Sequence, residues 1–103
     1  MENKPIKVEL LYFEGCPSYK RAWADLLDVV VENNLQITAK PINIESLEKA
    51  EGLVFAGSPT ILINGQDLEN YNGETVMACR IYQENDNNGW PSKDLLKRGL
   101  LDG

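Results

Sequence analysis

The stretch that most constrains the fold is an apolar run that ends at a glycine, a cysteine and a proline. Residues 6–13 (IKVELLYF) alternate at first and then become apolar on both sides, which is typical of a strand with two buried faces. Glu14-Gly15-Cys16-Pro17 follows, and residues 17–33 then repeat apolar side chains at the three-and-four spacing of a helix. A strand that leads into a helix through so tight a turn predicts Cys16 at the helix N-terminus. Free N–H groups and the positive end of the helix dipole favour the thiolate form of a cysteine there.

Length, charge and cysteine content narrow the class of protein. The 103 residues predict a single domain over 1–103, with residues 1–5 as a polar, flexible arm. The net charge of −6 disfavours nucleic acid and anionic membranes as partners. No apolar run approaches the roughly 20 residues that span a bilayer, and the first residues lack the pattern of a secretion signal. With only two cysteines and no histidine, we expect a cytoplasmic protein without a disulfide scaffold or a His-based catalytic site.

The rest of the chain predicts alternating strands and helices. Pro41 marks an edge strand because it donates no ladder hydrogen bond, and Asn64-Gly65 is a strong hairpin signal. Ser92 is expected to cap the last helix. The expected elements after the first helix are strands at 35–44 and 60–64, a hairpin partner strand that starts at residues 66–68, a returning strand at 79–83, and helices at 46–51 and 91–101. The predicted fold class is α/β, in the order strand-helix-strand-helix-strand-strand-helix, with a four-stranded mixed sheet and helices on both faces.

In this element order the chain resembles the thioredoxin-like superfamily, in the small, glutaredoxin-sized form found in bacterial proteins. The resemblance rests on Gly15-Cys16-Pro17 between strand and helix, on Ser58-Pro59-Thr60 before the third expected strand, and on the motifs FEGCPS, GSPTILINGQDL and CRIY. It implies a thioredoxin-like fold and a cis peptide bond at Pro59, where the backbone of Ser58 would pair with an extended thiol substrate. The substrate-binding positions it implies are Pro17, Ser18, Tyr19, Ser58, Pro59 and Thr60.

One departure from the family pattern concerns the second cysteine of the Cys-x-x-Cys motif. Tyr19 occupies that position, so the sequence predicts a single thiol, Cys16, that acts through mixed disulfides. The partner would be a protein or a small thiol or disulfide, such as glutathione, and no bound cofactor is expected. A non-catalytic protein-binding module is the alternative function.

Cys79 allows more than one interpretation. It would serve as a resolving thiol if its Cα atom lay within about 7 Å of that of Cys16. The sequence favours instead a buried small apolar residue, which is what a free cysteine most often is. A metal or metalloid site of Cys16, Cys79 and Glu14 is a weaker alternative, because no ligand-spacing motif accompanies it.

Overall fold

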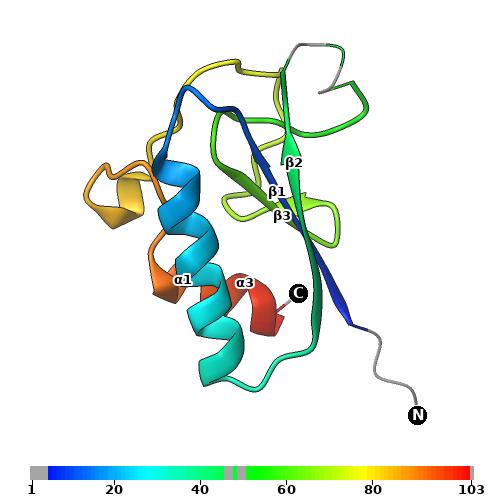
Figure 1. Ribbon diagram of the computed structural model, residues 1–103, viewed down its shortest axis with the longest axis vertical. Coiled ribbons are helices and arrows are strands. Elements are labelled where there is room, and N and C mark those ends of the chain that lie inside the picture. Colours follow the sequence, from blue (N-terminus) through cyan, green and yellow to red (C-terminus); the bar gives the residue numbers. More distant parts are fainter. Residues whose placement is uncertain (1–4, 46–47, 49–50, 103) are drawn as a thin grey trace.

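A four-stranded mixed sheet forms the centre of the computed structural model, which describes residues 5–45, 48 and 51–102 (Figure 1). Two α-helices, labelled α1 and α3, accompany the sheet within this part of the chain. Four positions of the helix expected over residues 46–51, namely 46, 47, 49 and 50, lie outside the described residues. The described elements are β1 (Ile6–Tyr12), α1 (Ser18–Glu32), β2 (Ile37–Asn43), β3 (Thr60–Ile63), β4 (Gln66–Asp67), the 3₁₀ turn η1 (Gln83–Asn85) and α3 (Lys93–Asp102).

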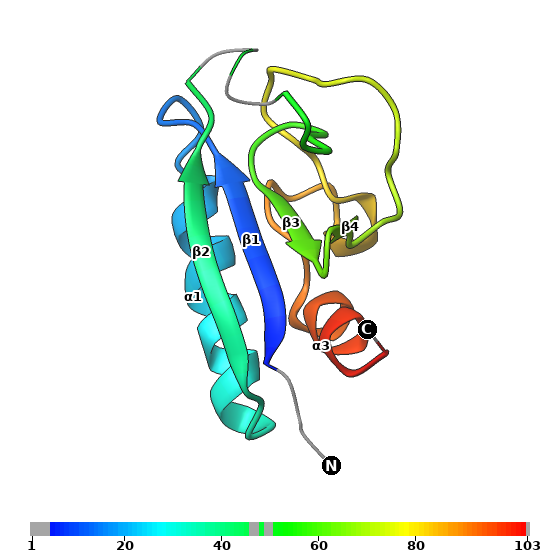
Figure 2. The same cartoon turned by 90° about the vertical axis from the view of Figure 1, so that its right-hand side faces the viewer.

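The strands lie in the order β2-β1-β3-β4 (Figure 2). β1 is central: it runs parallel to β2 and antiparallel to β3. Pro41 lies on β2, which is an edge strand, as its missing N–H group predicts. The predicted mixed α/β sheet is therefore confirmed, with β1 ending beside the start of β3.

The hairpin after β3 confirms one turn prediction, while the strand predicted after it is wrong. Asn64 and Gly65 both have positive φ, 53° and 85°, as a two-residue type I′ turn requires. The returning strand β4 has only two residues. The predicted strand over 79–83 is replaced by isolated bridges at Cys79 and Tyr82 and by η1. The reason is tertiary: the backbone around Cys79 pairs with Ser58, which precedes β3, while the Arg80 side chain binds a buried carboxylate.

Both described helices pack on the same face of the sheet. Buried side chains of α1 and α3 meet those of β1 and β3 in one core of Val8, Leu10, Ala22, Leu26, Val29, Ile61, Ile63, Leu96 and Leu100. The opposite face holds a smaller cluster of Leu11, Ile44, Phe55 and Leu62. Helices were expected on both faces, but both described helices lie on one. Two residues outside regular structure, Ile44 and Phe55, cover the second face.

The ends of the two helices follow from local chemistry. Ser92 caps α3, with its Oγ accepting the N–H of Leu95 at 3.1 Å, as predicted. Pro17 is the N-cap residue of α1 and places Cys16 immediately before the first turn. Neither helix that the structure describes has the length and apolar character of a membrane-crossing segment.

Candidate functional site: a disulfide beside the start of β3

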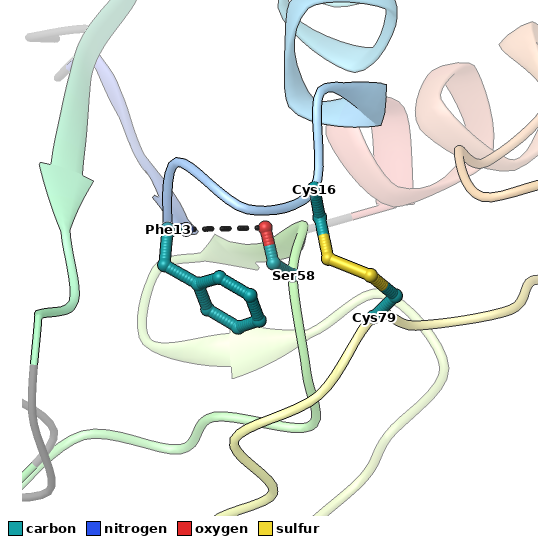
Figure 3. The surroundings of a disulfide bond; sticks show 4 residues. All are labelled: Phe13, Cys16, Ser58 and Cys79. Atoms are coloured by element: carbon teal, nitrogen blue, oxygen red, sulfur yellow. Dashed lines mark hydrogen bonds between the residues drawn. A yellow bond between two sulfur atoms is a disulfide. The ribbon is translucent and has the colours of Figure 1, made fainter.

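The site lies where the chain leaves β1 for α1. In the antiparallel register Leu11 pairs with Thr60, so the turn after β1 comes next to the residues that precede β3. The N–H group of Phe13 donates to the Oγ of Ser58 at 3.2 Å, which joins the two segments (Figure 3). Sequence positions more than 40 residues apart are thus brought together by the sheet register rather than by any local pattern.

Cys16 and Cys79 form a disulfide bond across this site (Figure 3). Their Cα atoms are 5.8 Å apart, within the usual range for such a bond, and 63 positions separate them in the chain. The sequence-based prediction of a single free thiol is therefore wrong, because Cys79 supplies the second sulfur that Tyr19 does not. The favoured interpretation of Cys79 as a buried small apolar residue is also wrong: Cys79 is exposed, and Cys16 is the buried partner, with 2% of its surface accessible.

The segment around Cys79 pairs with the backbone of Ser58. The N–H group of Ser58 donates to the carbonyl oxygen of Ala78, and the N–H group of Arg80 donates to the carbonyl oxygen of Ser58, both at 2.9 Å. These Ser58 groups were expected to pair with a substrate, and in the structure they pair with the chain's own segment. The Ser58–Pro59 peptide bond is cis, as expected from the resemblance.

Gly57 allows this close approach. Its φ is +107°, in the region that side-chain-bearing residues rarely adopt, and a Cβ atom there would lie 2.8 Å from the carbonyl oxygen of Ala78. The main chain at Ala78 can therefore rest directly on the residues that precede β3, which places Cys79 over Cys16.

Arg80 anchors the segment from the other side of Cys79. Its guanidinium binds the Asp67 carboxylate in two parallel contacts of 2.6 and 2.8 Å, and Asp67 is only 3% exposed. A third contact of 3.1 Å reaches Glu69. Burial lowers the pKa of Arg80, but the hydrogen bond to Asp67 and the nearby negative charge outweigh burial, so the pKa lies above its ordinary value. The Arg80 charge is therefore permanent and stays paired with Asp67.

Tyr82 completes the anchor. Its hydroxyl donates to the carbonyl oxygen of Pro59 at 2.7 Å, and the centre of its ring lies 4.4 Å from the guanidinium carbon of Arg80. Burial raises the pKa of the Tyr82 phenol, and the nearby Arg80 charge opposes this shift only in part. Arg80 and Tyr82 thus hold the segment after Cys79 against both ends of the Ser58–Thr60 stretch.

The remaining predicted substrate-binding residues have identifiable contacts. Pro17 is exposed at the start of α1, and Ser18 packs against Gly89, where an added Cβ atom would come 2.5 Å from its hydroxyl oxygen. The hydroxyl of Thr60 donates to the carbonyl oxygen of Gly57 at 2.6 Å and faces Arg80. Pro17 is thus accessible next to Cys16, whereas Thr60 is buried and its hydroxyl holds the backbone of Gly57.

Tyr19 stacks on Tyr12, with ring centroids 4.1 Å apart. Its hydroxyl donates to Glu14 at 3.2 Å. Desolvation, followed by this hydrogen bond and the Glu14 charge, raises the pKa of Tyr19. Tyr19 is therefore an uncharged aromatic side chain that packs beside the turn that carries Cys16.

No group of three or more Cys, Asp or Glu side chains among the described residues is arranged to hold a metal ion. The two sulfurs that a site with Glu14 would need are bonded to each other. Metal binding by this set would therefore first require reduction of the disulfide.

Comparison with known proteins finds that no family model, curated protein or solved structure matches the chain. Arg80, Asp67 and Tyr82, which hold the segment of Cys79 in place, were not predicted from the sequence. A signal was present, because Asp67 and Arg80 are charges of opposite sign that each adjoin an apolar residue, Leu68 and Ile81, in predicted strands. A charged side chain needs a partner of opposite charge where the rest of the chain buries it. In the structure Asp67 and Arg80 are each other's partner.

Proposed function

We propose that the protein catalyses thiol–disulfide exchange and has a thioredoxin-like fold in which Cys16 and Cys79 replace the usual adjacent pair. The observation that carries the proposal is their disulfide, with Cα atoms 5.8 Å apart, beside the Ser58–Pro59 backbone. The strand-turn-cysteine-helix order and the mixed sheet support it further. The small number of cysteines predicts the cytoplasm as its compartment, where a disulfide is usually transient and catalytic, as exchange requires.

The exchange needs no bound cofactor, because the two sulfurs carry both electrons. In the reduced protein one cysteine thiolate attacks a substrate disulfide, forms a mixed disulfide and releases one substrate thiolate. The second cysteine then attacks the mixed disulfide, releases the other substrate thiolate and closes the Cys16–Cys79 bond. The substrate gains two electrons and the protein loses two. The short Cα distance keeps the second step within the molecule.

A second candidate function is a non-catalytic binding module in which the disulfide is a structural staple. One observation favours it: none of the side chains of residues 72–79 is buried, so the disulfide and the backbone hydrogen bonds of Val76 and Ala78 are what attach this segment. The two functions differ in the reduction potential that they require. Structural disulfides usually resist reduction at potentials above about −300 mV, while exchange proteins equilibrate with cellular thiols at about −120 to −270 mV.

A redox titration separates the two functions. The protein is equilibrated in glutathione buffers of graded potential and quenched with an alkylating reagent, and intact mass then counts the free thiols. We expect the disulfide and dithiol forms to interconvert inside the cellular range, with Cys79→Ser as the control that forms only a glutathione adduct at Cys16. A disulfide that persists at about −300 mV would refute exchange and leave the binding module.

A further inference from the structure

The two cysteines of the disulfide differ sharply in accessibility. Cys16 is 2% exposed, whereas Cys79 is an exposed residue. Figure 3 shows the bond that joins them. Cys79 also lines an open cleft with Ala56, Tyr71 and Ile81. Cys79 therefore offers an external thiolate an approach from solvent on its side of the disulfide, while the Cys16 side is covered.

We propose that Cys79, and not Cys16, forms the bond to the external thiol, which belongs to an apolar segment of another protein; this rests on the proposed exchange function. In thiol–disulfide exchange the incoming thiolate bonds to one sulfur while the other sulfur leaves. Attack at Cys79 forms the external S–S bond, breaks the Cys16–Cys79 bond and leaves its electron pair on Cys16. The sequence analysis predicted the opposite assignment, with the mixed disulfide at Cys16.

Cys16 is the better leaving group of the two. It comes one residue before Pro17, the N-cap of the 15-residue helix α1, so it lies near the free N–H groups of the first turn and the positive end of the helix dipole. A thiolate that is stabilised in this way leaves faster, because the rate of exchange rises as the pKa of the leaving thiol falls. Cys79 lies in an irregular segment after β4 and has no such helix end.

The backbone on both sides of Cys79 stays attached when the disulfide opens. Ser58 pairs with Ala78 and Arg80, and the Arg80 side chain is held by the buried Asp67 carboxylate. Cys79 with its external partner therefore remains close to the Cys16 thiolate. Cys16 can return to displace the partner, which makes it the resolving thiol in this direction.

The surface around Cys79 indicates the kind of partner. Val76, Met77 and Ile81 lie within three positions of Cys79 and are 39%, 39% and 59% exposed. Ile81 lines the cleft that holds Cys79, and Met77 lines a separate cleft with Phe13 and Ile44. Glu69 and Arg80 both line the cleft of Cys79, and Arg80 is paired with Asp67 and Glu69, so these three groups together carry a negative charge. This charge and the −6 of the whole chain disfavour an anionic thiol such as glutathione. A cysteine flanked by apolar, uncharged residues fits this surface better.

Trapping the mixed disulfide tests which sulfur is attacked. The oxidised protein is mixed briefly with a synthetic peptide that carries one cysteine between leucines, and N-ethylmaleimide then blocks every free thiol. Peptide mapping by mass spectrometry is expected to find the peptide on Cys79 and maleimide on Cys16. The reverse pattern would overturn the assignment while leaving the exchange function intact. A protein in which neither cysteine reacts would refute the exchange function itself.

The matched variant Ile81→Gln tests the partner class, because Ile81 is exposed and its replacement leaves the core intact. We expect the leucine-flanked peptide to react with this variant slower by roughly threefold or more, since one apolar contact is lost. Glutathione, which does not use that contact, is expected to react with the variant and the parent at the same rate. An equal loss with both thiols, or no loss with the peptide, would overturn the apolar-segment partner.

Discussion

Replacement of Arg80 by methionine is expected to lower the free energy of unfolding by about 3 kcal/mol or more. The change removes an Arg80 side chain that is 6% exposed and leaves the Asp67 side chain, which is 0% exposed, without its cation. Breaking a buried ion pair by removing one partner costs about 3–5 kcal/mol. Two N–H groups, of Glu69 and Tyr71, still donate to Asp67 at 2.8 and 3.2 Å, which places the expected loss at the lower end of that range.

The assay is urea unfolding of the oxidised protein, with the transition midpoint and slope fitted for each variant. Lys93→Met is the matched control, because it removes the pair of Lys93 with Asp28, whose side chains are 46% and 58% exposed. Such a surface pair contributes about 0–1 kcal/mol. A loss for Arg80→Met no larger than that of Lys93→Met would refute the reasoning that the buried pair anchors this segment.

A double substitution separates the charge from the packing. When Asp67→Asn is combined with Arg80→Met, the buried site is neutral, and the oxygen of the introduced amide can still accept an N–H bond. We expect this variant to be more stable than Arg80→Met alone, because no unpaired charge is buried. Equal or lower stability of the double variant would show that the guanidinium acts through its contact with Tyr82 rather than through charge pairing.

Three further predictions concern the same site. Reduction of the Cys16–Cys79 bond, which joins residues 63 positions apart, is expected to lower the free energy of unfolding by about 4 kcal/mol from chain entropy, measured by urea unfolding with and without reductant; an unchanged midpoint would contradict this. Gly57→Ala is expected to lower the free energy of unfolding by about 1–3 kcal/mol because of its φ of +107°, and by more because of the contact with Ala78. In the same assay this loss should exceed that of Gly65→Ala, because Gly65 also has a positive φ but has open space around it. Tyr82→Phe is expected to cost about 1 kcal/mol or more, because the carbonyl oxygen of Pro59 loses its donor. Because burial raises the pKa of Tyr82, its contribution to the free energy of unfolding is complete below the pKa of the unfolded chain, about 10, and is lost as the pH rises above it. The loss of stability at alkaline pH should therefore be smaller in Tyr82→Phe than in the parent protein. Identical losses in the two proteins would refute this.

The amino-acid sequence alone determined the features that depend on near neighbours. The period of 6–13 and 17–33 predicted β1 and α1, Asn64-Gly65 predicted the hairpin, and Ser92 predicted the cap of α3. In each case the cause is local: side-chain period, positive φ or a hydroxyl near free N–H groups. Cys16 was placed before α1 for the same reason.

The partner of Cys16 was decided only by the tertiary structure. Cys79 lies 63 positions away, on a segment whose composition suggested a strand. Its path depends on the pair of Arg80 with Asp67 and on the lack of a side chain at Gly57, which govern contacts between distant parts of the chain. A sequence pattern describes the neighbours of a residue along the chain, whereas the meeting of these two sulfurs depends on sheet register and buried charge. The cysteine after β1 was therefore predictable, and its conversion from a single thiol into one half of a disulfide was not.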